Sequence, residues 1–416
     1  MNSSFRSTRT YRLLVWILIA ICILSIYLLV ADRGPGMIPY GDSVQYWAAG
    51  NLVLRGENPY SAEKVMELRI SEGNNLIFPP NSTSMMLYPP WVIPFLLPFG
   101  FNNYPLMRLL WFIFHIVILV ISANAIWKLY EGKSKKKYVI YLILLTFPPT
   151  YFVLVIGHFT TLHLLGLVGF LYFLHKKPVS RWNNFAAGAF ASIVLLKPQL
   201  MYLYVIALLI WIIKQRNWYL MAGGLSTIGI LSLISISINP QIYSQYWETI
   251  SNYESGPWLT PTIGMGLRSI FGLQYEWLQL VPILLGAGWF LYYWSKKGQN
   301  WNWIDDLPLL LLVGFVTVPY GWTYDMVILL IPVIAIIIQV MEIKFDWKVV
   351  LFFISFLVVN LATLYLHSFL DDFWFLWYAP FLLVWYLSGK RLQRKSTITV
   401  INTMNEHPIP EEYQSS

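Results

Sequence analysis

The sequence predicts an all-α membrane protein with about twelve transmembrane helices. Of its 416 residues, 57% are hydrophobic and only 12% are charged, whereas a typical soluble chain carries about 25% charged residues. The mean hydropathy of +0.57 indicates that the apolar excess runs through the whole chain. Short polar stretches divide the chain into apolar segments suited to membrane helices. These observations favour a polytopic membrane protein over a soluble fold.

Composition also argues against other classes. The single cysteine, Cys22, lies in an apolar segment, so neither a disulfide framework nor a cysteine-based metal site is expected. The net charge of +8 comes from small basic groups between apolar segments, a pattern typical of cytoplasmic loops. No spacing of carboxylates and histidines indicates a metal site. We therefore expect no nucleic-acid partner, no metal and no cofactor.

Twelve apolar segments are candidates for membrane spans, which need about 20 apolar residues, or fewer inside a bundle. They are residues 11–30, 105–129, 138–156, 159–174, 185–197, 201–213, 218–238, 277–294, 307–319, 326–340, 349–369 and 374–389. The first segment is expected to stay as an anchor, because no signal-peptide cleavage site follows it. One membrane domain, 1–395, is predicted, followed by a polar tail, 396–416, that is expected to be disordered.

Basic residues orient these segments. The basic groups are Arg6/Arg9/Arg12, Lys133/Lys135/Lys136/Lys137, Lys176/Lys177/Arg181, Lys214/Arg216, Lys296/Lys297 and Lys390/Arg391/Arg394/Lys395. With twelve spans, all of them fall on one side of the membrane, which the positive-inside rule makes the cytoplasm. Residues 91–101 are apolar, but counting them as a span would move the Lys133 group outside. We therefore expect 91–101 to form a re-entrant or interfacial helix.

Two long loops, 31–88 and 239–276, then lie outside the cytoplasm. They are rich in Tyr, Trp, Gly and Pro, which is not the composition of disordered chain, and ordered loops of this length are often functional. The sequence of the first loop predicts two short amphipathic helices, 43–54 and 62–70, which would lie in the membrane interface. Val44, Ala48 and Leu52 would form one stripe of the first helix, and Val65, Met66 and Arg69 would share a face of the second.

Asp42 is the first candidate for chemistry. It precedes the predicted helix 43–54, with Gln45 three residues later. This spacing is typical of a capping box, in which the side chain accepts hydrogen bonds from the first helical turn. A carboxylate at a helix N-terminus is also kept ionised, as a general base requires. Both roles stay open from these residues alone.

Further polar residues interrupt apolar segments near the outer face. Lys197, before Pro198 and Gln199, fits either a lysine snorkelling to the interface or an ammonium that binds an anionic lipid head group. His158 follows Gly157 in an outer turn and fits a simple hydrogen-bonding role.

Later in the chain, the segment 319–325, with Trp322 and Tyr324, fits a turn with interfacial aromatic residues. Asp371 and Asp372 fit a solvated turn. Arg268, in the second loop, fits pairing either with a phosphate or with loop carboxylates.

Several of these residues form an ordered pattern. The motif Asp-x3-Tyr-x-Ala-x7-Gly-x2-Pro-Tyr comprises Asp42, Tyr46, Ala48, Gly56, Pro59 and Tyr60, and it is followed by Tyr88-Pro89-Pro90, Pro98, Gly157, Lys197-Pro198-Gln199, Pro319 and Trp322. Over roughly residues 40–330 the chain resembles glycosyltransferase family 87, the bacterial polyprenol-phosphate-mannose-dependent α-1,2-mannosyltransferases with the C-type membrane fold.

This resemblance implies an inverting hexosyltransferase, in particular a mannosyltransferase, in the plasma membrane. The donor would be a polyprenyl-phosphate sugar used on the extracytoplasmic face, and the acceptor a lipid or glycan hydroxyl. The family's catalytic base maps onto Asp42. Substrate contacts are expected from Lys197, Gln199, His158, Tyr46, Tyr60, Trp322, Tyr324 and Arg268. The family often carries a histidine shortly after the tryptophan, where this chain has Thr323, Tyr324 and Asp325.

Two other classes compete with a transferase. A transporter or lipid flippase for lipid-linked saccharides would also have many spans, but it usually shows repeated halves and ionisable residues at mid-membrane depth. The sequence shows no such repeat, and its candidate polar residues gather near the outer face. A structural or sensory membrane protein would leave the two long outer loops unexplained.

The predicted orientation can be tested by labelling. An impermeant thiol reagent added outside the cell should reach a cysteine placed at Asn74 and miss one placed at Ser134. The reverse pattern would contradict the orientation, because Asp42 would then face the cytoplasm.

Overall fold

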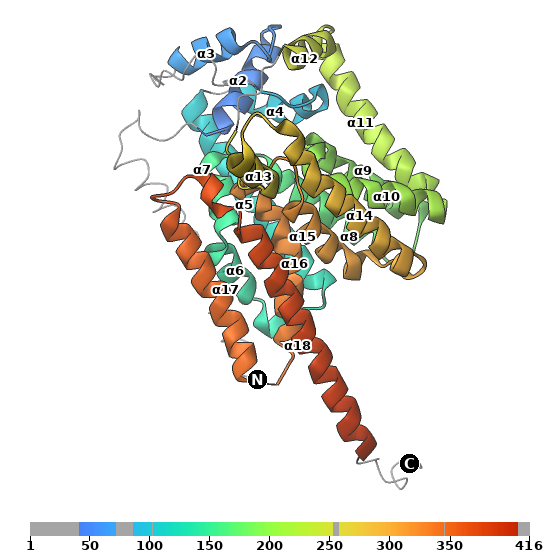
Figure 1. The fold of residues 1–416 in the computed structure, drawn as a ribbon. Coiled ribbons are helices and arrows are strands. Elements are labelled where there is room, and N and C mark those ends of the chain that lie inside the picture. The colour runs from blue at the N-terminus through green and yellow to red at the C-terminus, as the bar shows by residue number, and fades with distance from the viewer. Residues whose placement is uncertain (1–40, 72–85, 102, 253–257, 345, 407–416) are drawn as a thin grey trace, which may run out of the picture.

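The computed structural model describes residues 41–71, 86–101, 103–252, 258–344 and 346–406, and over these residues it contains helices and no strands (Figure 1). The predicted all-α class is thus confirmed. The predicted first span, 11–30, lies outside the described residues, as do the basic residues at 6, 9 and 12.

Nine α-helices lie in the N-terminal half of the described chain and eight in the C-terminal half. The first are α2 (Ser43–Leu54), α3 (Ala62–Ser71), α4 (Ile93–Gly100), α5 (Tyr104–Leu129), α6 (Val139–Thr146), α7 (Pro148–Ile156), α8 (Thr160–His175), α9 (Arg181–Ser192) and α10 (Tyr202–Gln215). The second are α11 (Trp218–Ile238), α12 (Ile242–Ser251), α13 (Ile263–Phe271), α14 (Leu280–Lys297), α15 (Trp303–Val316), α16 (Leu330–Val340), α17 (Trp347–Leu366) and α18 (Tyr378–Glu406). Short 3₁₀ helices include η1 (Pro90–Val92), η3 (Ile193–Leu196), η4 (Pro198–Met201), η7 (Thr323–Leu329) and η8 (Asp372–Phe375).

Five helices of the described chain are long and apolar enough to cross a membrane. They are Tyr104–Leu129, Pro198–Gln215, Trp218–Ile238, Thr323–Val340 and Trp347–Leu366. A sixth span is possible if Ser134–Thr146 and Pro148–Ile156, bent by 57°, count as one. Two prolines begin the second half of this pair, and proline interrupts helical hydrogen bonding. The membrane class is therefore supported. The predicted count of twelve spans is not confirmed, because only five or six helices of the described chain are long and apolar enough.

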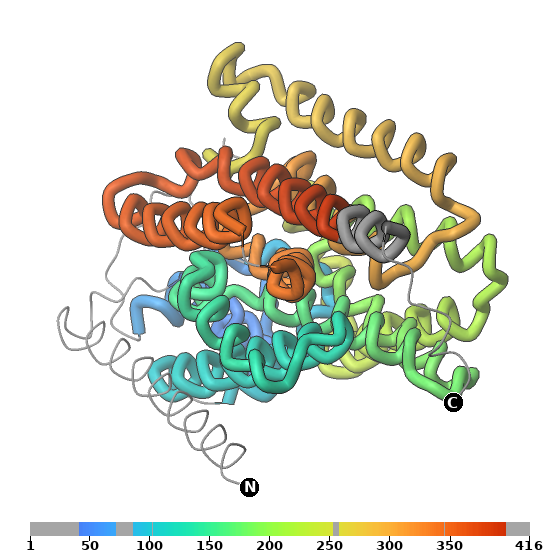
Figure 2. The backbone as a smooth tube through the Cα atoms, turned by 90° about the horizontal axis from the view of Figure 1, so that it is seen from below, coloured from blue at the N-terminus to red at the C-terminus, as the bar shows by residue number. Residues whose placement is uncertain are grey.

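The core is organised around η7 and α16. Of this continuous Thr323–Val340 segment, 94% is buried inside the protein, as expected for a helix that is apolar on all sides. Helices α5, α8, α15 and α18 pack against it, and α16 lies at the centre of the bundle in both views (Figures 1 and 2). Because η7 begins this segment, the residues at its start are held rigidly at one end of the bundle.

Helices α2, α3, α4 and α12 cover that end (Figure 1). Helix α2 has the predicted bounds, but nine of its twelve residues are buried, so it is not an interfacial helix with one apolar stripe. Glycines allow this burial: a Cβ on Gly100 would lie 2.5 Å from the backbone of Gly50. The two helices pack backbone to backbone, which places the start of α2 against the bundle.

The predicted interfacial segment 91–101 forms η1 and α4, a short apolar helix. It is tied to the bundle by two hydrogen bonds: Ser235 Oγ donates to the Pro90 carbonyl at 2.7 Å and Trp91 Nε1 to the Leu195 carbonyl at 3.1 Å. In the second long loop the structure has α12 and α13. At the C-terminal side, α18 continues to Glu406, beyond the predicted start of a disordered tail at 396.

Basic residues gather at the opposite end of α16 from η7. Lys133 and Lys136 pair with Glu342, and the ammonium of Lys136 also donates to the Met341 carbonyl at 3.0 Å, just past the end of α16. The two ends of the buried helix therefore have different neighbours: the lysines lie at the end of α16, and α2 lies at the start of η7.

Candidate active site

A cavity of about 710 Å³ lies where η7 begins. Its polar lining residues come from the start of α2, the segment before η1, α7, the η3–η4 junction, the turn into η7, and the segment from the end of α17 to η8. The described lining is Gly41, Asp42, Gln45, Leu87, Tyr88, Tyr151, Phe152, Val155, Ile156, Lys197, Gln199, Trp258, Tyr320, Trp322, Tyr324, His367 and Asp372. A cavity of this size holds a small molecule or a lipid head group.

Asp42 faces this cavity and does not cap α2. Its side chain accepts no capping hydrogen bond from the backbone N–H groups of the first turn of the helix. Instead, Oδ2 accepts a hydrogen bond from the hydroxyl of Tyr324 at 3.2 Å, and the amide of Gln45 lies 3.5 Å from Oδ1. The capping hypothesis is therefore wrong for this side chain, which is directed toward η7.

Burial raises the pKa of the Asp42 carboxyl to about 6. The Lys197 ammonium and the Tyr324 hydroxyl lower this pKa, and the Asp325 carboxylate raises it, so burial is the largest of several opposing influences. A carboxylate with a pKa just below neutrality is mostly ionised at pH 7 and still accepts a proton readily, which is the combination that a general base needs.

Lys197 stands at a break in the chain between η3 and η4. Pro198 follows it and lacks a backbone N–H, so the helix cannot run through. The ammonium lies 2.6 Å from Oδ2 of Asp325, and both side chains are at most 1% exposed. Lys197 lines the cavity, but its ammonium is buried inside the protein, which excludes a snorkelling role.

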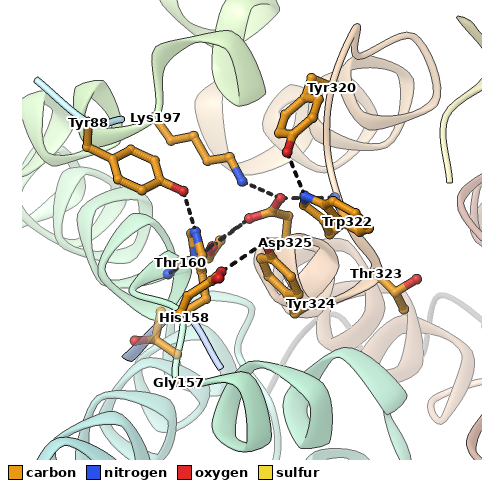
Figure 3. Close-up of polar contacts among 12 residues, drawn as sticks. Tyr88, Gly157, His158, Thr160, Lys197, Tyr320, Trp322, Thr323, Tyr324 and Asp325 are labelled. Atoms are coloured by element: carbon orange, nitrogen blue, oxygen red, sulfur yellow. Dashed lines mark hydrogen bonds and ion pairs between the residues drawn. The ribbon is translucent and has the colours of Figure 1, made fainter. Parts of the chain in front are cut away.

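Asp325 is the centre of a buried polar network (Figure 3). Besides the Lys197 ammonium, its Oδ2 accepts the backbone N–H of Trp322 at 3.0 Å. Its Oδ1 accepts the hydroxyl of Thr160 at 2.6 Å. Each hydrogen bond that a buried carboxylate accepts reduces the free-energy cost of burying its charge.

The network continues to Tyr88 through a histidine. His158 Nδ1 lies 2.5 Å from the Thr160 hydroxyl, and its Nε2 lies 2.8 Å from the hydroxyl of Tyr88 (Figure 3). The backbone N–H of Thr160 also donates to Nδ1 at 3.1 Å, so Nδ1 is an acceptor and a proton on Nε2 would donate to the hydroxyl of Tyr88. Gly157, at φ +70°, makes the turn, and a Cβ there would lie 2.7 Å from that of Ser43.

The structure brings six of the predicted site residues together. Asp42, Lys197, Gln199, Trp322 and Tyr324 line the cavity, and His158 lies directly behind Tyr88. The ring of Tyr324 stacks between Trp322 and His158, at centroid distances of 6.3 and 4.7 Å. This packing fixes the hydroxyl that contacts Asp42.

Three predicted site residues do not reach the cavity. Tyr46 is fully buried among aromatic rings. Tyr60 donates its hydroxyl to the carbonyl of Tyr88 at 3.0 Å and so supports a cavity residue from behind. Arg268 is held by the Leu273 carbonyl, by Gln279 and at 3.9 Å by Glu276, which resolves its alternatives in favour of neighbouring groups in the second loop.

Sequence reasoning missed His367 and misinterpreted Asp372. The Asp371-Asp372 pair was expected to be a solvated turn, but Asp372 lines the cavity and accepts the backbone N–H of Thr323 at 3.0 Å. It also bonds His367 Nε2 at 2.8 Å. The five-residue spacing of a histidine and an aspartate was the only available signal, and it is too common to identify a site.

Fold and cavity together define an integral-membrane protein with a polar site at one end of its helical bundle. The model for glycosyltransferase family 87 matches residues 86–319, more than half of the chain. The chain therefore belongs to glycosyltransferase family 87 and is a membrane glycosyltransferase, which acts on a sugar donor and an acceptor. Comparison with curated proteins and with solved structures found no match.

The buried pair makes a prediction about stability. Lys197→Met leaves the Asp325 carboxylate buried without its ammonium, and we expect the free energy of unfolding to fall by about 3–5 kcal/mol. Lys197→Met/Asp325→Asn removes both charges and keeps an acceptor for Thr160, so it should recover most of this loss. Thermal and denaturant unfolding in detergent would measure both variants.

The matched control is Lys64→Met, which breaks the exposed pair with Glu57 and should cost at most about 1 kcal/mol. A Lys197→Met protein as stable as Lys64→Met would contradict the structural importance of the buried pair.

Proposed function

We propose that this glycosyltransferase moves a hexose from a polyprenyl-phosphate donor to a hydroxyl acceptor on the extracytoplasmic face of the plasma membrane, with Asp42 as the general base. The observation that carries the proposal is the position of Asp42: it is uncapped, faces the cavity and has a pKa near 6. The choice of mannose rests on the family resemblance alone.

The proposed reaction is a single displacement. The Asp42 carboxylate removes the proton of the acceptor hydroxyl while the acceptor oxygen attacks the anomeric carbon. The bond from that carbon to the phosphate oxygen breaks, and its electron pair leaves with the polyprenyl phosphate. Because attack and departure occur on opposite faces of the sugar, the configuration inverts. One positioned base is sufficient for this chemistry.

The cavity lining supports a lipid-linked donor. Tyr151, Phe152, Val155 and Ile156 of α7 form an apolar wall beside the polar groups. An apolar chain binds along such a wall by the hydrophobic effect, while its phosphate head meets the polar part of the same cavity. Lys197 lies in that polar part, although Asp325 balances its charge.

The distribution of basic residues supports an extracytoplasmic site. The Lys133–Lys137 group lies at the far end of the buried helix from the cavity. Basic groups mark the cytoplasmic side of membrane proteins, and an 18-residue helix is roughly 27 Å long, close to the thickness of a bilayer core of about 30 Å. The cavity would then open on the other side.

The direct test is product formation. Purified protein would be incubated with polyprenyl-phosphate-mannose and candidate acceptor lipids, and the products analysed by mass spectrometry. A glycosylated acceptor with release of polyprenyl phosphate supports the proposal. Movement of the donor across vesicle membranes without a product would instead favour a flippase.

Replacing the base gives the sharpest mutational prediction. Asp42→Asn should reduce turnover by about 10²–10⁴-fold, because an amide cannot accept the proton. Stability should stay near that of the wild type, because the Asp42 side chain makes no capping bond. Initial rates and unfolding curves would be measured together.

The control for this variant is Asp371→Asn, at an exposed carboxylate that does not line the cavity, and it should behave as wild type. Asp42→Asn activity above about a tenth of the wild-type value would refute the catalytic assignment.

The raised pKa of Asp42 predicts a pH profile. The base works in its ionised form, so the transfer rate should be highest above about pH 6 and fall below it as the carboxyl is protonated. The expected decrease is about tenfold per pH unit. Rates between pH 4.5 and 8, with unfolding followed at each pH, would separate titration from acid denaturation. A rate that stays level down to about pH 5 would contradict this role.

A further inference from the structure

His367 is held in a fixed orientation at the edge of the cavity. It follows the last residue of α17, and its Nε2 lies 2.8 Å from Oδ1 of Asp372. The other oxygen of Asp372 accepts the Thr323 N–H at 3.0 Å. The imidazole ring stacks on Phe375 at 4.2 Å and contacts Phe152 at 4.0 Å. A side chain held by a hydrogen bond and two rings is preorganised for binding.

The charges around the cavity give His367 a role. Among the described lining residues, the basic side chains are those of Lys197 and His367, and the acidic ones are those of Asp42 and Asp372. Lys197 is paired at 2.6 Å with Asp325, so much of its field is cancelled. His367 is likewise paired with Asp372, at 2.8 Å through Nε2, which leaves its Nδ1 as a second basic-residue nitrogen that can contact an anion in the cavity.

Three features around His367 attract positive charge. The Asp372 carboxylate forms a charge-assisted hydrogen bond with an imidazolium. The C-terminal end of α17 carries a partial negative charge from its free carbonyl groups. Aromatic faces attract cations within about 6 Å, and both Phe152 and Phe375 lie within that range. In the imidazolium form, Nδ1–H is the second donor.

His367 also lies where a lipid phosphate would be placed. Phe152, which contacts the imidazole ring, is part of the apolar wall of α7 that lines the cavity. A polyprenyl chain along this wall would bring its phosphate to the polar side chains at the end of the wall. Of the two basic lining residues, His367 is the one whose ring contacts Phe152 of this wall.

We propose that His367, oriented by Asp372, binds the phosphate of the lipid donor by donating Nδ1–H to a phosphate oxygen. This inference rests on the proposed polyprenyl-phosphate donor. It makes His367 a second phosphate-binding group beside Lys197, in a distant part of the chain and outside the 86–319 segment that matches the family.

Binding of a short-chain polyprenyl phosphate in detergent, measured by competition with a fluorescent analogue, would test this inference. His367→Gln should weaken binding by about tenfold to a hundredfold, the usual effect of losing a hydrogen bond to a charged group. His367→Arg should stay within about threefold of wild type, because a guanidinium stacks on aromatic rings and donates to phosphate. The same substitution at exposed His175, outside the cavity, should change nothing.

A parallel measurement with the uncharged polyprenol separates phosphate binding from packing. His367→Gln should leave polyprenol binding unchanged. Equal binding of polyprenyl phosphate to wild type and His367→Gln, or an equal loss for polyprenol, would overturn the role of His367 while leaving the proposed function intact. Wild-type protein that binds no polyprenyl phosphate would overturn both.

Discussion

The buried ion pair between Lys197 and Asp325 is the interaction on which the site depends. It joins the proline-broken junction of η3 and η4 to the start of the central helix, 128 residues later, and Thr160 adds the α7–α8 turn to the same carboxylate. Two charges at this depth persist only when their hydrogen bonds are nearly complete. Asp325 meets this condition, and a local rearrangement of any one of the three segments would leave a charge or a donor unpaired. The cost of that loss keeps the cavity in one shape.

The same pair sets the electrostatic environment of Asp42. An isolated ammonium close to the Asp42 carboxylate would keep its pKa low and make it a weak base. Asp325 opposes the effect of Lys197, and burial then dominates, so the pKa of Asp42 rises to about 6. Tyr324 joins the two parts physically: it precedes Asp325 in the chain and its hydroxyl contacts Asp42. The short 3₁₀ helix η7 thus directs the Asp325 carboxylate into the core and the Tyr324 hydroxyl toward Asp42.

Local features were predictable from the sequence, and pairings across the chain were not. The helix 43–54 follows from apolar and turn residues within a short window, and α2 has those bounds. Asp42 was identified because it precedes a predicted helix and begins the ordered motif, and Lys197 because it breaks an apolar segment. The partners of these residues lie 282 and 128 positions away, and no periodicity carries that information. The capping alternative for Asp42 failed because capping is a local rule, whereas the hydrogen bond from Tyr324 to the carboxylate depends on the tertiary fold. His367 and Asp372 are close in the chain, but their pairing depends on where α17 ends and how the chain turns into η8, which a five-residue spacing does not specify.

Charge movement during the proposed transfer explains why basic groups would be spread over the cavity. A polyprenyl-phosphate sugar is a phosphodiester with one negative charge, and Asp42 carries another before the reaction. Transfer neutralises Asp42 and increases the negative charge on the departing phosphate, so charge moves from α2 toward the leaving group. A cation beside Asp42 would oppose this movement, and one beside the phosphate favours it, because only interactions that strengthen toward the transition state accelerate the reaction. Lys197 is balanced by Asp325, and His367 is held by Asp372 against the apolar wall of α7. In this arrangement Asp325 limits the effect of Lys197 on Asp42, and His367 supplies a hydrogen-bond donor on the proposed phosphate side of the cavity.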